Sequence, residues 1–361
     1  MLFITSEFPP QPGGIGEHAY QLASFLSQKG KKVTVLTDRR SLDGKEEAVF
    51  DTALPFTVKR IKRTSFLSFT YINRCLKALS LLNKHQIILV SGKFSLWMVS
   101  LLRKFTSKKI IAIIHGTEVL LPKKRQRKFT EKCLLQCDAV IAVSKFTASL
   151  VAHLPLKKLV IIPNGIVIPQ NPKIHPKSKT DSLQLITVGN LTQRKGQHHV
   201  IQVLPMLKKT LPEVHYHMVG LPTDMEKLQQ LAEDLEVSQR VTFHGRVSAM
   251  EKDQLLDASA LFMMLSENTD EGDVEGFGIA ILEANTRGLP AIGALGCGIE
   301  DAIENGFSGE LVDSKNPESI VDAVHKIRSN YEVYSKNAVE WSLRFNWNNI
   351  VERYLLLMDD N

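Results

Sequence analysis

The chain has 361 residues, 43% of them hydrophobic, which is enough to form the cores of two ordinary domains. It contains no run of about 18 uncharged apolar residues, so its composition argues against a membrane-spanning helix. The four cysteines form no CxxC pair, and the chain opens directly on an apolar, strand-like run. These features predict a cytoplasmic protein.

Charge is distributed unevenly along the chain. Residues 1–168 contain 27 Lys and Arg against 10 Asp and Glu, a net charge of +17, whereas the remainder has a net charge of −10. Two basic clusters, Lys59–Arg63 and Lys123–Lys128, contribute much of the excess, and the apolar segment Phe66–Ile72 follows the first. No nucleic-acid-binding signature accompanies them, so we expect no nucleic-acid partner. An anionic lipid surface, an anionic substrate and solvated faces remain as alternatives.

Short apolar runs alternate with helix-length segments throughout, which is typical of buried parallel strands joined by helical crossovers. In the first half, strands are expected at 2–5, 32–37, 87–90, 110–114, 139–143 and 159–162. In the second half, they are expected at 183–188, 214–219, 240–243, 261–264, 290–292 and 310–312. The Pro-rich, polar segment 169–181 predicts a linker. The fold class is therefore α/β, with two Rossmann-like domains.

A glycine-rich turn follows the first expected strand. Gly14 and Gly16 precede a helix-like segment, and free N–H groups at a helix start attract phosphate oxygens. The same glycine-rich segment also fits a dinucleotide-binding fingerprint, with Asp38 as its ribose-binding acid. A nicotinamide-dependent oxidoreductase is therefore one alternative. Against it, a long loop with three prolines separates Thr5 from the glycines, whereas the fingerprint needs a tight turn directly after the strand.

Several polar residues follow later strands. Arg194 and Lys195 stand at an expected helix start, where two cations can neutralise the charge that develops on a leaving diphosphate without a metal ion. The histidines at 198, 199, 215 and 217 lack metal-ligand partners in the sequence, so we expect them to be structural. A single His115 after strand 110–114 is ambiguous on its own.

The stretch Glu275–Glu283 is the most informative part of the chain. Gly276 and Gly278 let the backbone approach a ligand closely, and an apolar, helix-like run follows them. The two carboxylates stand eight residues apart. This spacing suits contact with hydroxyl groups at the two ends of a sugar nucleotide.

This stretch resembles the E-x7-E motif of retaining glycosyltransferases of the GT-B fold, in the large family numbered four. The resemblance implies that Glu275 contacts the donor sugar and that Glu283 binds the nucleotide ribose. It also implies two sets of site residues: catalytic His115, Arg194, Lys195 and Glu275, and donor-binding Gly14, Gly16, Gly245, Arg246, Phe277, Gly278, Ile279 and Glu283. The family often has an Arg where this chain has Asn190, so Arg194 is the expected substitute.

For the fold, the resemblance implies a GT-B architecture, with two Rossmann-like domains facing a central cleft. The expected divisions are an acceptor-side domain at 1–168, a nucleotide-sugar-binding domain at 169–342 and a C-terminal helix at 343–361 that crosses back to the first domain.

For function, the resemblance implies a retaining, metal-independent hexosyltransferase whose co-substrate is a nucleoside-diphosphate sugar, with no other cofactor. Its acceptor would be a glycan, a lipid-linked glycan or a small molecule in polysaccharide or glycoconjugate biosynthesis. Retention by a short-lived ion pair and by a covalent intermediate both remain open. We expect a cytoplasmic enzyme, peripheral on the inner face of the cell membrane through its basic first domain. Besides the oxidoreductase, a non-catalytic anion-binding or membrane-binding protein of the same fold is the remaining alternative.

Overall fold

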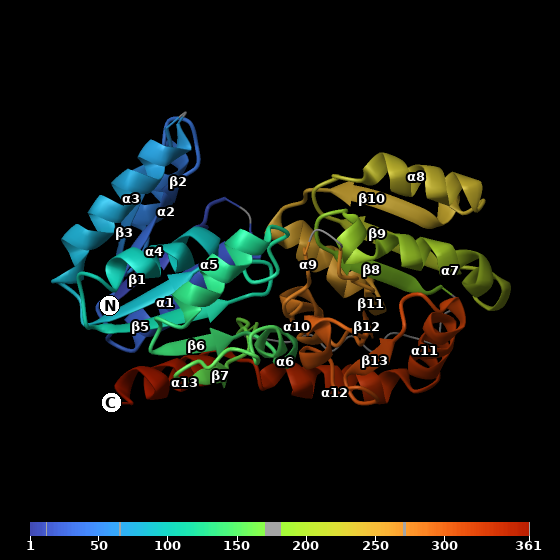
Figure 1. Ribbon diagram of the computed structural model, residues 1–361. Helices are drawn as coiled ribbons and strands as arrows, with labels where there is room; N and C mark the ends of the chain where they lie inside the picture. Colours follow the sequence, from blue (N-terminus) through green and yellow to red (C-terminus); the bar gives the residue numbers. More distant parts are fainter. Residues whose placement is uncertain (12, 65, 170–181, 270–271, 361) are drawn as a thin grey trace. The chain divides into compact units, whose positions relative to one another are not determined.

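The computed structural model describes residues 1–11, 13–64, 66–169, 182–269 and 272–360, so the expected linker at 169–181 lies almost wholly outside the described residues. The chain forms two compact units (Figure 1). The first comprises Met1–Gly165 and the chain from Trp347 onward, and the second comprises Ile166–Asn346. These divisions lie three residues before and four residues after the predicted boundaries at 168 and 342.

The first unit is a seven-stranded parallel sheet in the order β3-β2-β1-β4-β5-β6-β7. Its central strands are buried on both faces because helices cover the sheet (Figure 1). The strands are β1 (Leu2–Thr5), β2 (Thr34–Arg39), β3 (Thr57–Lys62), β4 (Ile87–Ser91), β5 (Lys109–Ile114), β6 (Ala139–Ala142) and β7 (Leu159–Ile161). The helices are α1 (Gly14–Gln28), α2 (Lys45–Thr52), α3 (Leu67–Leu82), α4 (Lys93–Leu102), α5 (Lys124–Leu134), α6 (Lys145–Ser149) and α13 (Trp347–Asp359).

The C-terminal helix α13 packs on α1 and completes the first unit. The Trp347 ring stacks on Phe25 with their centroids 5.9 Å apart. A Cβ added at Gly165 would lie 2.4 Å from that indole, so only a glycine leaves room for the ring. The Tyr354 hydroxyl reaches the buried His18 Nε2 at 3.1 Å.

The second unit is a six-stranded parallel sheet in the order β10-β9-β8-β11-β12-β13. Its strands are β8 (Gln184–Val188), β9 (His215–Val219), β10 (Val241–Gly245), β11 (Leu261–Met264), β12 (Ala291–Ala294) and β13 (Gly309–Val312). Its α-helices are α7 (Gln197–Thr210), α8 (Met225–Asp234), α9 (Ala249–Ala258), α10 (Ile279–Asn285), α11 (Pro317–Ser329) and α12 (Tyr331–Leu343). Short 3₁₀ turns are η1 (Gln193–Lys195), η2 (Ser238–Arg240) and η3 (Gly298–Asp301).

The alternation of apolar runs predicted every strand except β3. That strand contains the basic cluster around Lys59 and Lys62, and its charges mask the periodicity of a strand. It tolerates them because it lies at the edge of the sheet, where charged side chains reach solvent.

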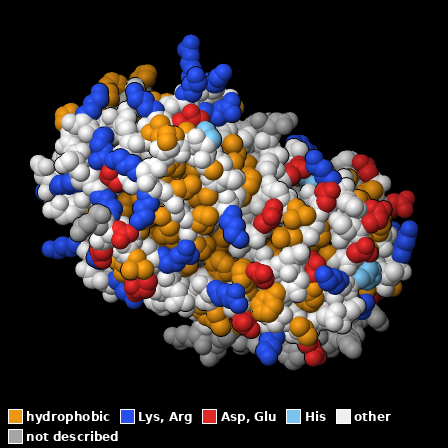
Figure 2. All heavy atoms as spheres, turned by 60° about the horizontal axis from the view of Figure 1, so that its bottom comes forward, with side chains coloured by type: hydrophobic (Ala, Val, Ile, Leu, Met, Phe, Trp, Pro, Cys, Tyr) orange, Lys and Arg blue, Asp and Glu red, His pale blue; other side chains and the backbone are white. Residues whose placement is uncertain are grey.

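Many of the basic side chains of the first unit are exposed, including five of the six residues from Lys123 to Lys128. On the face shown in Figure 2, Lys and Arg side chains stand at the surface beside hydrophobic ones. Among the described residues, no helix is both long and apolar enough to span a bilayer.

Candidate active site

Two cations of the second unit meet at one carboxylate oxygen. The Lys195 Nζ lies 2.6 Å from Glu275 Oε2, and the Arg194 guanidinium lies 2.5 Å from the same atom. Arg194 also donates a hydrogen bond to Asp273 at 3.0 Å. These residues are far apart in sequence, but β8 and β11 are neighbours in the sheet, so the loops that follow their carboxyl ends share one edge.

The charges of this cluster decide which groups it can bind. Burial would raise the pKa of the Glu275 carboxyl, but the charges and hydrogen bonds of Lys195 and Arg194 outweigh burial and lower the pKa to about 2. Glu275 is therefore ionised at neutral pH and repels a phosphate, whereas it can accept a hydrogen bond from a neutral hydroxyl. The two cations beside it attract an anion. The cluster thus suits a ligand whose hydroxyl and anionic groups are neighbours.

The turn that presents the cations depends on a glycine. Arg194 and Lys195 lie on η1, and Gly196, with φ +70°, connects η1 to α7. A Cβ at Gly196 would lie 1.8 Å from the carbonyl oxygen of Leu265, the residue directly after β11. Because that space is closed, only glycine lets the turn pack against the strand.

Glu283 belongs to a different ion pair. It lies on α10, and its Oε2 is 2.9 Å from the Nζ of Lys252, a residue of α9. The Glu283 side chain is 40% exposed, whereas that of Glu275 is 13% exposed. The structure therefore brings Arg194, Lys195 and Glu275 together and places Glu283 beside Lys252. No local sequence pattern predicts the pairing of Lys252 with Glu283, because Lys252 precedes Glu283 by 31 residues.

The other predicted donor-binding residues of this unit differ in exposure. Phe277 is buried and its ring lies 5.8 Å from that of Phe345, so its side chain packs in the interior of this unit. Gly278 has φ +88° and precedes α10, which begins at Ile279. Gly245 ends β10 with φ +67°, and Arg246 after it is exposed.

The remaining predicted residues lie in the first unit. His115 follows β5, and its Nε2 lies 3.0 Å from the Ser91 hydroxyl at the end of β4. Burial lowers the pKa of His115 to about 4, so the imidazole is neutral at pH 7. Gly14 and Gly16 are the first and third residues of α1 rather than part of the loop before it.

Two residues that the sequence pattern does not single out, Glu118 and His18, support His115. Glu118 Oε1 accepts a hydrogen bond from the His115 backbone N–H at 2.7 Å. Glu118 is 2% exposed, and burial raises the pKa of its carboxyl to about 7. The ring of His18 meets the His115 ring edge-on at 5.1 Å. Glu118 stands only three residues after His115 in the sequence. Its burial, which only the structure shows, distinguishes it from a solvent-exposed acid.

Asp38, the candidate ribose-binding acid of the oxidoreductase alternative, is engaged elsewhere. It is 3% exposed at the end of β2 and pairs with Arg74, which is equally buried, and with Arg63 at 3.1 Å. A carboxylate held by two guanidinium groups has no free oxygen to recognise a ribose. This geometry counts against the oxidoreductase.

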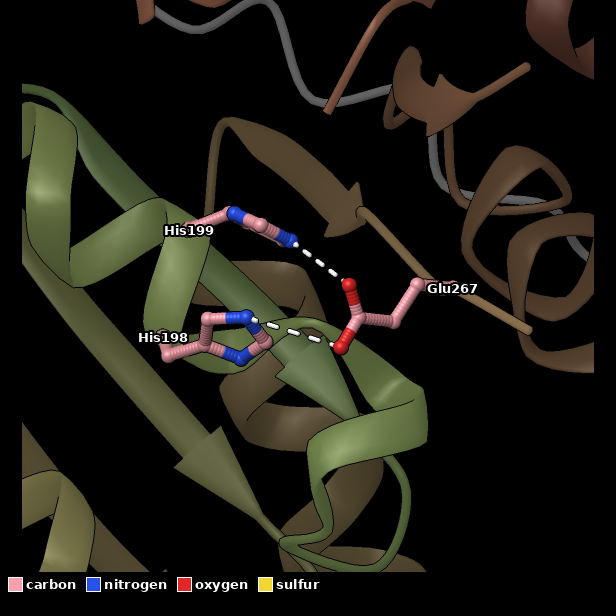
Figure 3. A group of neighbouring side chains, drawn as sticks. All are labelled: His198, His199 and Glu267. Atoms are coloured by element: carbon pink, nitrogen blue, oxygen red, sulfur yellow. Dashed lines mark hydrogen bonds and ion pairs between the residues drawn. The ribbon is translucent and has the colours of Figure 1, made fainter. Parts of the chain in front are cut away.

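The expectation that His198 and His199 lack a possible metal-ligand partner was wrong. Glu267 follows β11 and lies beside both imidazoles, with Oε1 3.9 Å from His198 Nε2 and Oε2 3.4 Å from His199 Nε2 (Figure 3). The sequence did not reveal Glu267 as a partner, because it is far along the chain from both histidines.

Residues 12–168 match the model of the family described as Glycosyltransferase Family 4, and residues 169–341 match that of Glycosyl transferases group 1. A GDP-mannose-dependent alpha-(1-6)-phosphatidylinositol monomannoside mannosyltransferase of Mycolicibacterium smegmatis is 27% identical over 343 residues, covering 90% of this chain and 88% of its own. A glycogen synthase of Mycobacterium tuberculosis is 25% identical over 362 residues, covering 91% of this chain and 85% of its own.

Solved structures agree on the fold. The Anabaena protein HepE, in complex with UDP and glucose, superposes with a TM-score of 0.82 at 18% identity, with full coverage of both chains. WaaG, a glycosyltransferase involved in lipopolysaccharide biosynthesis, gives a TM-score of 0.71 at 15% identity, also with full coverage. The two family models together cover almost the whole chain, and both units have the parallel sheets of this fold. The protein is therefore a GT-B glycosyltransferase of the group 1 family.

Proposed function

We propose that the protein transfers a sugar, with retention of anomeric configuration and without a catalytic metal ion, from a nucleoside-diphosphate sugar to a membrane glycolipid or lipid-linked glycan. The observation that carries the proposal is the convergence of Arg194 and Lys195 on Glu275. It puts two cations suited to a diphosphate next to a carboxylate suited to a sugar hydroxyl. GDP-mannose is the first donor to test, because the M. smegmatis relative is named for it, and UDP-glucose is the second.

In the proposed reaction, the bond between the anomeric carbon and the diphosphate oxygen breaks while an acceptor hydroxyl attacks from the same face. The acceptor proton passes to the departing diphosphate oxygen. Negative charge grows on the diphosphate, so Lys195 and Arg194 stabilise the transition state more than the ground state. The neutral His115 imidazole is suited to a hydrogen bond with a sugar hydroxyl rather than to phosphate binding.

A membrane-associated acceptor is supported by one face of the first unit. Phe69, Ile72 and Leu76 lie three and four residues apart on α3 and are 58%, 53% and 60% exposed, and Phe66 before the helix is 71% exposed. On the same helix, side chains of α3 join side chains of α4, including Trp97, in lining an open apolar pocket of about 250 Å³. Such an apolar stripe next to basic side chains is typical of a helix that lies in a membrane interface.

The basic residues of this face are not equivalent. Arg60 is nearly buried and pairs with Asp51 at 2.8 Å, so it is not available to lipid head groups. The exposed Lys124 and Lys128 at the start of α5 are better candidates. They lie on the helix whose Phe129 ring meets Trp97 of α4 at 5.7 Å. We call α3, the start of α5 and the α4 side chains between them the basic-apolar face.

The experiment that tests the proposed activity is a thermal-shift screen with GDP, UDP, ADP and their sugar conjugates, followed by NMR of the transfer product. A ligand at 100 times its dissociation constant should stabilise the fold by about 2.7 kcal/mol. The product should keep the anomeric configuration of the donor. An inverted product would refute the retaining mechanism, and donor binding without hydrolysis or transfer would favour a non-catalytic role.

A further inference from the structure

His198, His199 and Glu267 form a compact group of possible metal ligands. The two histidines occupy the first turn of α7, and Glu267 comes from the loop after β11. One ligand atom from each of the three lies within 4.8 Å of the others. Figure 3 shows both imidazoles pointing toward the carboxylate, each facing a different oxygen.

The distances in this group fit an ion better than direct hydrogen bonds. His198 Nε2 is 3.9 Å from Glu267 Oε1, beyond hydrogen-bonding range, and His199 Nε2 is 3.4 Å from Oε2, at the long end of that range. Nitrogen and oxygen ligands bound at about 2.1 Å to a tetrahedral ion stand about 3.4 Å apart. The three ligand atoms all lie within 4.8 Å of one another, close to the spacing of such a shell.

The surroundings supply the support and the access that a metal site needs. The Gln193 side-chain amide donates to Glu267 Oε1 at 3.1 Å, and the Glu267 N–H donates to the carbonyl oxygen of Arg194 at 2.9 Å. A hydrogen bond to the carboxylate, such as that from Gln193, orients a ligating carboxylate, and the main-chain bond ties Glu267 to the turn. His198 also lines a cavity of about 550 Å³ beside α8, through which an ion and its remaining water ligand can enter.

We propose that His198, His199 and Glu267 bind a divalent transition-metal ion, with Zn²⁺ as the best fit. Two imidazole nitrogens and one carboxylate suit zinc, whereas Mg²⁺ and Ca²⁺ prefer oxygen ligands alone. Because Glu267 is hydrogen-bonded to both Gln193 and Arg194, the ion braces the turn that carries the two cations. Its role is structural and does not replace those cations at the diphosphate.

The test is isothermal titration of ZnCl2 into chelator-treated full-length protein, in the absence of any nucleotide. We expect one saturable site in the wild-type protein and no saturable heat with MgCl2. His199→Gln and Glu267→Gln should each weaken Zn²⁺ binding at least tenfold. The matched control is His217→Gln on β9, which removes an imidazole bonded to Gln184 and His244 and should leave the affinity unchanged.

A thermal-shift measurement adds a second readout. Zn²⁺ should raise the melting temperature of the wild-type protein and of His217→Gln, but not that of Glu267→Gln. Should Glu267→Gln fail to fold by circular dichroism, Gln193→Ala replaces it, with an expected tenfold loss of Zn²⁺ affinity. Equal affinity in all variants, or no saturable binding by the wild-type protein, overturns the site. Because no donor is present, this result is independent of the proposed glycosyl transfer.

Discussion

At the scale of single residues, one buried carboxylate organises the candidate active site. Glu275 pairs with both Lys195 and Arg194, so it holds the cations in place and also fixes their separation from any sugar hydroxyl that it binds. Neither cation can move without leaving a buried, ionised carboxylate short of a partner, which is costly. The roles of the three residues are therefore coupled.

Lys195→Ala should lower turnover by roughly two to three orders of magnitude, because the lost charge would otherwise stabilise the departing diphosphate. Arg194→Ala should give a similar loss if Arg194 replaces the cation that is absent at position 190. Steady-state rates measured on folded protein check both, with Lys208→Ala on α7 as a matched control that keeps wild-type turnover. A near-normal turnover of the Lys195→Ala enzyme would show that Lys195 does not stabilise the leaving diphosphate.

The two glutamates should respond differently to loss of charge. Glu283→Gln should weaken the binding of the free nucleoside diphosphate, since a carboxylate accepts hydrogen bonds from ribose hydroxyls more strongly than an amide does. Glu275→Gln should retain or strengthen diphosphate binding, because it removes a negative charge beside Lys195 and Arg194, and yet it should reduce transfer. Calorimetry with the diphosphate and a transfer assay separate the two. Equal losses of diphosphate affinity would contradict this division of roles.

Glu118 should make the stability of the protein depend on pH. Its pKa of about 7 in the folded state lies above the ordinary value of 4.5, so its contribution is complete below about pH 4.5 and is lost as pH rises through 7. The loss should be about 3 kcal/mol of unfolding free energy. Glu118→Gln, which keeps the acceptor for the His115 N–H, should not show this pH-dependent loss of stability. Urea unfolding of both proteins at pH 5 and pH 8 measures the difference, and parallel pH profiles would refute it.

At the scale of elements, the candidate site is built from turns that follow strands rather than from the strands themselves. The apolar strands β8 and β11 supply only the alignment, and η1 and the loop before α10 supply the functional groups. Glycines with positive φ at 196 and 278 make both connections possible. Close backbone packing is therefore a condition for the chemistry.

Gly196→Ala should destabilise the protein by more than about 2 kcal/mol and abolish transfer, because the new methyl group would collide with the Leu265 carbonyl oxygen. Gly306→Ala is the matched control, since Gly306 has a similar φ of +76° but nothing within 4 Å of the added Cβ. That variant should lose only about 1–2 kcal/mol. Urea titration checks both values, and equal losses would mean that the conformation alone, not the close contact, demands glycine at 196.

At the scale of the whole molecule, charge divides along the chain, with the basic excess in the first unit. The structure shows which of those charges are free to act. Arg60 is nearly buried and paired with Asp51, whereas Lys59 and Lys62 of β3 and the lysines at the start of α5 are exposed. Any attraction to an anionic surface should therefore depend on these exposed lysines rather than on Arg60.

Sedimentation with anionic liposomes should retain the protein at low salt and release it at high salt, since ions screen the lipid charge. Lys124→Gln combined with Lys128→Gln should weaken binding, as should Phe69→Ser. The matched control, Lys208→Gln with Lys209→Gln, removes the same charge from the second unit and should bind normally. A wild-type protein that stays in the supernatant at low salt would exclude the basic-apolar face as a membrane contact and favour a soluble acceptor.

The sequence alone was sufficient to predict the two α/β domains and nearly all of their strands. Buried parallel strands are short apolar runs, because burial on both faces leaves a continuous apolar stretch that can be recognised without tertiary information. The resemblance around Glu275 and around Lys195 also predicted the family, because the residues that define each of these motifs are close together in the sequence. The edge strand β3 escaped prediction because an edge position permits charges that hide the pattern.

Only the tertiary structure could decide which charged residues meet. The pairing of Glu275 with Lys195, of Glu283 with Lys252, and of Glu267 with the two histidines joins segments that are distant in sequence. Such pairings depend on strand order, since parallel strands far apart in the chain become neighbours and align the turns at their carboxyl ends. Burial, which raises the pKa of Glu118 and commits Asp38 to Arg74, is likewise a property of the packed molecule. The residue type determines the chemistry that a side chain can perform, and the fold determines which group it interacts with.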